Sequence, residues 1–351
     1  MTSSIKIGER SIGVSFRPFV IAELSGNHGG SLERALNLVR AAADSGVDGI
    51  KLQTYKPETM TLDIRKNEFI IGENSSLWSG RSLYDLYTEG QTPWEWHAPI
   101  FQLAKDLGLI GFSTPFDSSA AEFLHNLNVP CFKIASSENV DVQLIRKVAS
   151  FGKPLIISTG MASISEIDDA VSVARNNGCK DLILLKCSAS YPADSSEANL
   201  RTIPNMRDVF NCEIGISDHT LGIGTSISAV ALGASVIEKH LTLDKLDGAV
   251  DSKFSMNPAE MKQLVNEVHD SWLSLGTVKY GPSKSEEASV RYRRSLYIVE
   301  EVRSGEILSI ENVRAIRPGL GLPIKNLEIV LGRKVNRNVA KGTPLTWDII
   351  S

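Results

Sequence analysis

Lysine side chains recur inside short β-rich runs along the first 245 residues of the sequence. They include Lys51, Lys133 and Lys186. A buried ammonium group needs an anionic partner, and three of them on one face favour a substrate that carries more than one negative charge, such as a phosphate together with a carboxylate. The hydroxyl groups that would assist belong to Ser136, Ser158 and Ser217. The alternative is that these lysines form structural ion pairs with Glu23, Glu138 or Glu238.

Two histidines, His219 and His240, come at the ends of two successive β-rich runs. Imidazoles on neighbouring strands could hold a divalent metal ion if a carboxylate such as Asp218, Asp251 or Glu23 lay nearby. Mixed nitrogen and oxygen ligands favour Mn²⁺ or Mg²⁺ over a closed zinc site. Such a metal would polarise a carbonyl group. Glu23, which ends the first run, is our candidate for acid–base chemistry.

The elements that must position these residues follow a simple alternation. Eight β-rich runs are expected at Phe19–Leu24, Gly49–Gln53, Leu109–Thr114, Cys131–Ser136, Leu155–Gly160, Leu182–Cys187, Glu213–Asp218 and Val236–Thr242. Helical patterns separate them, and eight strand–helix units in about 250 residues predict an α/β fold, the (β/α)8 TIM barrel. A doubly wound open sheet is the alternative, but its first turn would carry the order G-x-G-x-x-G, which the segment Ser25–Gly30 lacks.

Nearly every polar residue in these runs falls at the carboxyl end, where the active sites of TIM barrels lie. One connection, from Thr54 to Pro93, is 40 residues long and rich in aromatic residues. Strand–helix loops usually take about 2–6 residues. We expect this connection to cover the substrate, although a structural flap would also account for it.

The last part of the chain has a different character. We expect a barrel domain over residues 1–280, a polar linker over 281–294 and a small β-rich domain over 295–351, with strands at Ser295–Val299, Val313–Ile316 and Arg333–Val339. A unit of this size buries little of its own surface. It should therefore dock on another surface.

Composition narrows the function classes. The 351 residues carry a net charge of 37 − 41 = −4, which gives no basic surface for nucleic acid. No apolar run approaches the roughly 20 residues of a membrane helix, and the N-terminus lacks the apolar core of a signal peptide. The four cysteines have no paired spacing. We expect reduced thiols, a cytoplasmic protein, and neither nucleic acid nor membrane as a partner.

Six segments together resemble the sialic acid synthase family in order and spacing. They are Ala22–His28, Ser113–Phe116, Phe132–Ser136, Ser158–Met161, Gly215–Thr220 and Glu238–His240. The tail, with Ile316–Gly319, resembles the antifreeze-like (SAF, β-clip) domain of that family. The resemblance implies a transferase that condenses phosphoenolpyruvate with an open-chain amino-sugar aldehyde. Phosphate leaves by C–O cleavage, and the product is a nonulosonic acid.

The resemblance also implies roles for individual residues. His219 and His240 would bind a divalent metal, most naturally Mn²⁺, with Mg²⁺ or Co²⁺ as alternatives, and Glu23 would be the general acid/base. Residues expected to bind phosphoenolpyruvate are Lys51, Thr114, Lys133, Ser136, Ser158 and Ser217. Residues expected on the sugar side are Gln53, Asn27, Glu138, Tyr191, Glu238, Asp251 and Arg317. In the family, an arginine matching Arg317 reaches the active site of a partner subunit, which implies a domain-swapped homodimer.

Within the family, the segments Leu83–Tyr87, Thr92–His97 and Leu185–Pro192 resemble the branch that makes pseudaminic acid. Ala189 stands where N-acetylneuraminate synthases carry an asparagine. The expected sugar is therefore 2,4-diacetamido-2,4,6-trideoxy-L-altrose. N-acetylneuraminate or legionaminate synthesis is the alternative. Two further alternatives are an enzyme that makes a 3-deoxy seven- or eight-carbon sugar acid, and a non-catalytic sugar- or ice-binding protein.

Overall fold

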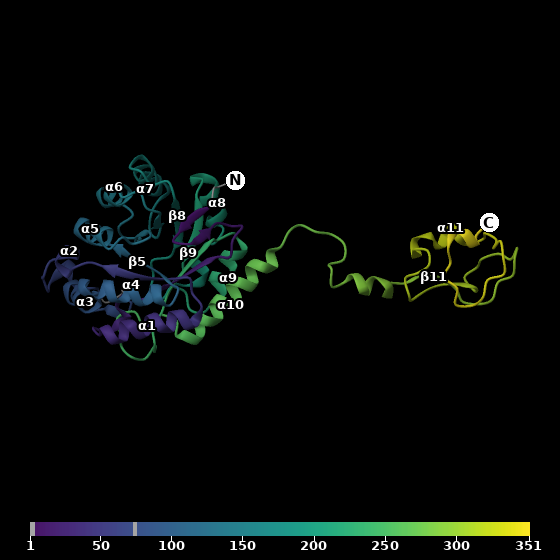
Figure 1. Ribbon diagram of the computed structural model, residues 1–351, viewed down its shortest axis with the longest axis horizontal. Coiled ribbons are helices and arrows are strands. Elements are labelled where there is room, and N and C mark those ends of the chain that lie inside the picture. Colours follow the sequence, from purple (N-terminus) through teal and green to yellow (C-terminus); the bar gives the residue numbers. More distant parts are fainter. Residues whose placement is uncertain (1–3, 73–75) are drawn as a thin grey trace. The chain divides into compact units, whose positions relative to one another are not determined.

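The computed structural model describes residues 4–72 and 76–351. The chain divides into two compact units, the first ending at Gly276 and the second beginning at Thr277. Eight parallel strands of the first unit close into a barrel in the order β10-β3-β4-β5-β6-β7-β8-β9 (Figure 1). Their bounds are β3 Phe19–Glu23, β4 Gly49–Thr54, β5 Ile110–Pro115, β6 Phe132–Ile134, β7 Leu155–Ser158, β8 Leu182–Cys187, β9 Glu213–Ser217 and β10 Val236–His240. The predicted TIM barrel is confirmed.

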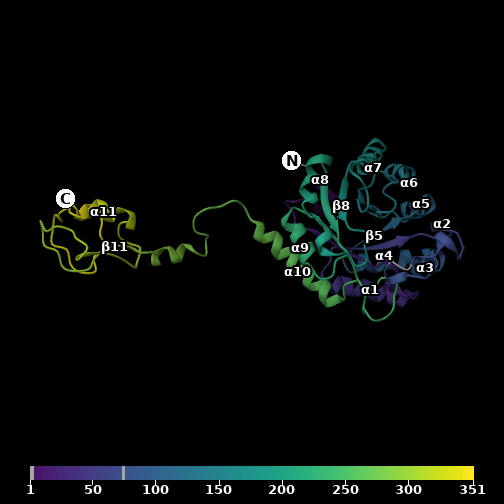
Figure 2. The same cartoon turned by 180° about the vertical axis from the view of Figure 1, so that it is seen from behind.

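The helices lie on the outside of the strands, as Figure 1 and the reverse view in Figure 2 show. They are α1 Leu32–Ser45, α2 Pro57–Met60, α3 Leu83–Gly90, α4 His97–Asp106, α5 Ser118–Asn126, α6 Val142–Ala149, α7 Ile164–Asn176, α8 Thr202–Phe210, α9 Gly224–Ala231 and α10 Pro258–Leu275. Local sequence sets their starts. In α7, for example, Ser163 accepts from the Glu166 amide while the Glu166 side chain accepts from the Ser163 amide, which is a capping box.

Side chains of the strands alternate between two environments. In β3, Val20 and Ala22 pack in the cluster under the helices, whereas Phe19 and Ile21 belong to the apolar cluster inside the barrel. Glu23 is the next inward position, so the interior changes from apolar to charged toward the carboxyl ends of the strands. This change places the chemistry at one end of the barrel.

A hairpin that the sequence analysis did not predict closes the other end. Strands β1 Ile5–Ile7 and β2 Arg10–Ile12 pair antiparallel. Ile5, Ile7 and Ile12 join the inner apolar cluster. The hairpin therefore plugs the amino-terminal end of the barrel.

The long connection after β4 contains short helices rather than irregular chain. Besides α2 and α3 it holds the 3-10 segments η2 Asn67–Phe69 and η3 Ser76–Trp78, and η4 Trp94–Trp96 follows it. Residues 73–75 of this predicted connection lie outside the described residues. Elsewhere in the barrel unit, a 3-10 turn η1 Ser25–His28 follows β3, and η5 Ser195–Glu197 precedes α8.

The second unit has its own small core. It contains η6 Glu287–Tyr292, β11 Ser295–Ile298, β12 Val313–Ile316, η7 Ile324–Asn326, α11 Leu327–Val330 and η8 Trp347–Ile349. β11 and β12 pair antiparallel, and residues such as Leu296, Val313 and Leu345 are fully buried. The strand expected at Arg333–Val339 is wrong. That segment forms only isolated bridges, such as that of Val339 with Val302. Its paired residues each meet a partner in a different part of the unit, so no continuous ladder of hydrogen bonds forms.

None of the helices within residues 4–72 and 76–351 is long and apolar enough to cross a membrane. All four cysteines are free and buried, in agreement with the expectation of reduced core thiols.

One glycine tests how tightly the barrel closes. A Cβ atom on Gly215 of β9 would clash with the Val236 carbonyl oxygen and lie 2.7 Å from Leu185 Cδ2. We expect Gly215→Ala to lower the free energy of unfolding by at least the roughly 1–3 kcal/mol of an overpacked core. Gly224, the first residue of α9, is the control, because a Cβ atom there would meet open space. Gly224→Ala should be neutral or stabilising by roughly 0.4–1 kcal/mol. Urea unfolding checks both, and equal midpoints for the two variants would contradict this account.

Candidate active site

Strand register places three charged or imidazole side chains side by side at the carboxyl end of the barrel. His240 of β10 pairs in register with Glu23 of β3, and Glu23 pairs with Lys51 of β4. Two residues earlier in β10, Glu238 pairs in register with Ser217 of β9. All five side chains are at least nine-tenths buried. The parallel register alone therefore builds the wall of the site.

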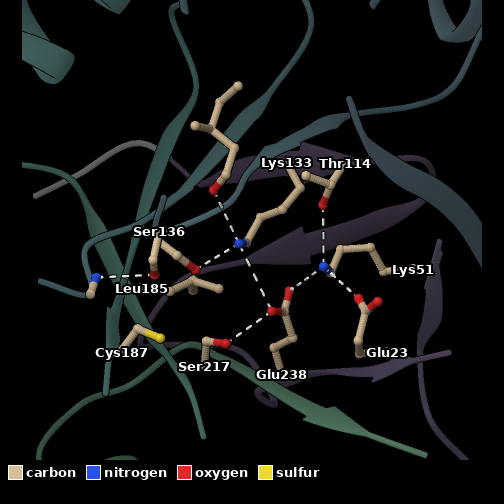
Figure 3. A network of polar contacts seen from close by, with 12 residues as sticks. Glu23, Lys51, Thr114, Lys133, Ser136, Leu185, Cys187, Ser217 and Glu238 are labelled. Atoms are coloured by element: carbon tan, nitrogen blue, oxygen red, sulfur yellow. Dashed lines mark hydrogen bonds and ion pairs between the residues drawn. The ribbon is translucent and has the colours of Figure 1, made fainter. Parts of the chain in front are cut away.

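A network of two lysines and two glutamates fills the mouth of the barrel (Figure 3). The Lys51 ammonium contacts Glu23 Oε2 and lies 3.7 Å from Glu238 Oε2. Lys133 Nζ lies 3.9 Å from Glu238 Oε1. Glu238 thus bridges the two lysines, and the four formal charges cancel. From the sequence alone, these lysines could either bind a substrate anion or form ion pairs with the protein's own glutamates. The structure pairs Lys51 and Lys133 with glutamates at the carboxyl end of the barrel.

Hydroxyl groups surround this network. Lys133 Nζ donates to Ser158 Oγ at 2.6 Å, and Lys51 Nζ donates to Thr114 Oγ1 at 3.2 Å. Ser217 Oγ donates to Glu238 Oε1 at 2.9 Å. Ser136 Oγ accepts from the Gly160 amide at 3.1 Å. All six residues predicted for the phosphoenolpyruvate site therefore lie together around the two lysines.

Lys186, the third lysine that the sequence singled out, does not join them. Its ammonium donates to the Cys187 carbonyl oxygen at 3.0 Å and it is only partly buried. The expectation of three lysines on one face is reduced to two.

The two glutamates have opposite pKa shifts. Burial raises the pKa of Glu23, and the Lys51 charge only partly opposes this. Burial also acts on Glu238, but the charges of Lys133 and Lys51 outweigh it and lower the pKa of Glu238. Burial lowers the pKa of Lys133. Two carboxyl groups whose environments drive their pKa values apart are the usual arrangement for an acid and a permanent anion. Glu23 is thus the group suited to carry a proton.

The two predicted histidines are neighbours. The ring centroids of His219 and His240 are 5.2 Å apart. His219 Nδ1 lies 3.0 Å from the Ser188 carbonyl oxygen, and His240 Nδ1 lies 3.4 Å from Ser25 Oγ. Burial lowers the pKa of His240 well below its ordinary value, so this ring is neutral. A partner on Nδ1 fixes the tautomer of a histidine and leaves Nε2 for a metal ion.

Among the described residues, no group of three or more His, Cys, Asp and Glu side chains could hold a metal ion. Asp218, one of the carboxylates considered as a third ligand, is fully occupied elsewhere. It accepts from the Thr220 amide and hydroxyl and from Ser226 Oγ, and it lies 3.1 Å from Lys239 Nζ. The idea that Asp218 ligates a metal is therefore not supported, because its oxygens fix the loop that carries His219.

An aromatic wall stands beside the histidines. It consists of Trp78, Tyr191 and Phe254. The Tyr191 ring centroid lies 4.5 Å from that of His219, and the Phe254 centroid lies 4.9 Å from that of His240. Trp78 packs on both Tyr191 and Phe254, at 5.9 and 6.4 Å, and its Nε1 donates to the Val250 carbonyl oxygen at 3.0 Å. The long connection after β4 thus reaches the site through Trp78.

The remaining predicted sugar-side residues take different positions. Gln53 lies two residues beyond Lys51 and pairs in register with Thr114. Glu138 is half-buried with one unpartnered oxygen, and burial raises its pKa to about 7. Asn27 is fully buried, and its amide nitrogen donates to Leu241 O and Ser255 Oγ, so only its Oδ1 has no partner.

Two predicted residues remain. Asp251 is buried beside His240, with 3.9 Å between Oδ2 and Nδ1. Arg317 is exposed in the second unit, where it lines a cavity of about 490 Å³ with Arg294 and Arg314.

Sequence reasoning missed Ser25 and Phe254. Ser25 contacts Glu23, Asp251 and His240. Its side-chain direction depends on a left-handed backbone, which no residue pattern indicated. Phe254 lies three residues after Asp251 in a segment without strand or helix periodicity. Its aromatic type was the only available signal.

Comparison with known proteins finds relatives of both the barrel and the C-terminal unit. Residues 38–280 match the NeuB family, and residues 293–350 match the SAF domain. The chain is 41% identical over 327 residues to the pseudaminic acid synthase of Campylobacter jejuni, covering 93% of this chain and 95% of that protein. It is 36% identical to the N,N'-diacetyllegionaminic acid synthase of Legionella pneumophila, covering 100% of this chain and 99% of that protein.

A solved structure agrees with these matches. The N-acetylneuraminic acid synthetase of Leptospira borgpetersenii superposes with a TM-score of 0.73 at 33% identity, covering 84% of this chain and 97% of that one. The predicted resemblance to sialic acid synthases and the predicted antifreeze-like tail are therefore confirmed. This chain belongs to the NeuB family.

Proposed function

We propose that this protein condenses phosphoenolpyruvate with 2,4-diacetamido-2,4,6-trideoxy-L-altrose to form pseudaminic acid and phosphate. The observation that carries the proposal is the buried network of Lys51, Lys133, Glu23 and Glu238 beside two imidazoles, in a chain 41% identical to a pseudaminic acid synthase. This environment favours an anionic substrate, because the two buried ammonium groups and the hydroxyls around them can bind a phosphate and a carboxylate.

The residues of the network have different roles in the proposed reaction. Lys51, Lys133 and the surrounding hydroxyls bind the phosphate and carboxylate of phosphoenolpyruvate. The enol carbon of that substrate attacks the aldehyde carbon, water adds to the former enol carbon, and phosphate leaves as the C–O bond breaks. Glu23 manages the proton of that water, in keeping with its raised pKa. Glu238 stays ionised and remains the carboxylate that both lysines share.

A divalent metal ion, Mn²⁺ by preference, fits the two histidines. The Nδ1 atoms of both imidazoles are engaged, so their Nε2 atoms would be the ligand atoms, and water and substrate oxygens would complete the shell. Burial lowers the pKa of His240, whereas at His219 burial is outweighed by the contacts with Cys187, which raise its pKa, so His219 would have to be deprotonated to bind the metal. When bound, the metal would polarise the aldehyde and stabilise the negative charge that develops on its oxygen. Mg²⁺ and Co²⁺ are alternatives. The buried free thiols are in keeping with a cytoplasmic enzyme.

The aromatic wall supports a deoxygenated sugar. Trp78, Tyr191 and Phe254 offer an apolar surface beside the histidines, which suits a methyl group where other sugars carry a hydroxymethyl group. Ala189 contributes no polar group at the loop after β8. Legionaminate and N-acetylneuraminate synthesis remain the alternative activities, since the Legionella and Leptospira synthases are 36% and 33% identical to this chain.

The second unit is the basis of a proposed dimer. We propose a homodimer in which residues 281–294 link the barrel of one subunit to an antifreeze-like domain, 295–351, that covers the partner's site. Exposed apolar residues on the loops at the carboxyl end of the barrel support a covering surface. They are Val140, Met161, Leu221 and Leu246. Arg317, with Arg294 and Arg314, would bring positive charge to the sugar acid.

The substrate is tested by phosphate release from phosphoenolpyruvate with Mn²⁺. We expect release with 2,4-diacetamido-2,4,6-trideoxy-L-altrose and little with N-acetylmannosamine, because the aromatic wall favours the methyl group. Removal of the metal by a chelator should abolish release, and Mn²⁺ should restore it. Release only with N-acetylmannosamine would overturn the sugar assignment, and full activity after chelation would overturn the metal.

Glu23 is tested by Glu23→Gln. The amide keeps the shape but cannot carry the proton, so we expect turnover to fall by about 10²–10⁴-fold. Binding of phosphoenolpyruvate, measured by calorimetry, should change little because both lysines remain. The control is Glu122→Gln, which alters an exposed glutamate of α5 that pairs with Lys147 of α6. Near-normal turnover of Glu23→Gln would remove Glu23 from the mechanism.

Arg317 is tested by co-expressing Glu23→Gln chains with Arg317→Ala chains. If Arg317 acts on the partner's site, each mixed dimer has one site with both residues intact. Random pairing then restores activity in about a quarter of the sites. Each variant alone should be nearly inactive. A mixture no more active than its components would contradict the swapped arrangement.

A further inference from the structure

Ser25 is a buried hydroxyl residue between the strand end at Glu23 and the loop that carries Asp251. We propose that Ser25 is a positioning residue of the active site, whose hydroxyl holds Asp251 in the orientation needed to bind the sugar substrate. The inference rests on the proposed function, because it assigns Asp251 to the sugar side.

The contacts of Ser25 reach three residues of the site. Its amide donates to Glu23 Oε1 at 3.0 Å. Its hydroxyl donates to Asp251 Oδ2 and lies 3.4 Å from His240 Nδ1. Ser25 and its hydroxyl partner come from opposite ends of the barrel sequence, 226 residues apart. One residue thus couples the acid–base group, a histidine and the sugar-side carboxylate.

The backbone at Ser25 is unusual. Its φ is 37°, in the left-handed region that glycine adopts freely and that side chains other than Asn and Asp rarely enter. A serine there costs free energy that a glycine would not. Such strain persists where the surroundings enforce it, and it gathers at functional sites. The hydroxyl group is the only functional group that serine adds over glycine at this position.

The surroundings do enforce this conformation. A Cβ on the next residue, Gly26, would lie 3.0 Å from Gly90 Cα and 3.2 Å from Val250 Cβ. The turn is therefore held between the end of α3 and the loop that precedes Asp251. Because the backbone is fixed from both sides, the Ser25 hydroxyl has a defined direction toward Asp251.

Loss of the hydroxyl would leave the Gly26 amide as a remaining hydrogen-bond donor to Asp251 and would not disturb the Glu23 contact, which uses the Ser25 backbone. Asp251 Oδ2 already lies 3.9 Å from His240 Nδ1, so a carboxylate held by one donor instead of two could turn toward that ring. A shift of about 1 Å in a positioning group can cost on the order of 100-fold in rate. The expected defect is specific for the sugar and spares phosphoenolpyruvate.

The test is Ser25→Gly, which removes the hydroxyl and relieves the backbone. We expect KM for the sugar to rise and kcat/KM for the sugar to fall about 10- to 100-fold. KM for phosphoenolpyruvate should stay within about twofold of the parent, because Lys51 and Lys133 are untouched. The control is Asn211→Gly, a change at another left-handed residue, φ 46°, that caps α8. It should leave both KM values unchanged.

A double-mutant cycle with Asp251→Asn separates a positioning role from a general one. If Ser25 acts through Asp251, Ser25→Gly should have little further effect on kcat/KM in the Asp251→Asn background. The same coupling should appear in urea unfolding, where Ser25→Gly stabilises the Asp251→Asn protein more than it stabilises the parent. The unfolding measurement does not depend on turnover.

The outcomes are distinct. A parent enzyme that releases no phosphate with any sugar would overturn the proposed function, and the unfolding cycle would then still decide whether Ser25 and Asp251 are coupled. Ser25→Gly with parental sugar kinetics, or effects that simply add to those of Asp251→Asn in both assays, would overturn the role of Ser25.

Discussion

The buried charges at the mouth of the barrel constrain everything else in this structure. Two lysines and two glutamates lie where water is excluded, and each would be very costly alone. Removal of one member leaves an uncompensated buried charge. The network therefore contributes little to the stability of the fold, but it is well suited to bind a charged ligand. An incoming anion finds cations that are already desolvated and already positioned. The protein offsets the cost of this arrangement by surrounding it with hydroxyl groups and by closing the apolar half of the barrel beneath it.

The same constraint explains how one strand register can serve two chemistries. Glu23 and Glu238 lie on adjacent strands and both contact Lys51, yet the pKa of Glu23 is raised and that of Glu238 is lowered. The difference comes from which lysine each carboxylate meets. Glu238 lies between both ammonium groups, whereas Glu23 meets only Lys51 as its ion-pair partner.

Much of this could be predicted from the sequence, because the strands and helices leave distinct patterns. Short, nearly continuous apolar runs such as Leu182–Cys187 marked the strands, as expected for parallel strands buried on both faces. Polar residues at strand ends marked the site, because a barrel brings those ends together. The failures have a different origin. The β1–β2 hairpin is only three residues per strand, too short for a periodic signal. Lys186 shares the type and place of the other lysines, but its ammonium meets the Cys187 carbonyl. The left-handed turn at Ser25 depends on packing from Gly90 and Val250, which are far away in sequence.

The hairpin at the amino-terminal end of the barrel determines from which end a ligand can enter. With Ile5, Ile7 and Ile12 packed into the interior from below, the charged network can be reached only from the carboxyl end. Lys133 and Ser158 are buried in this interior, which is closed at its amino-terminal end. If phosphoenolpyruvate binds at the two lysines and the sugar binds beside the aromatic wall, as proposed, both substrates enter through the same end. A plugged barrel thus gives the two substrates of the reaction a single entrance.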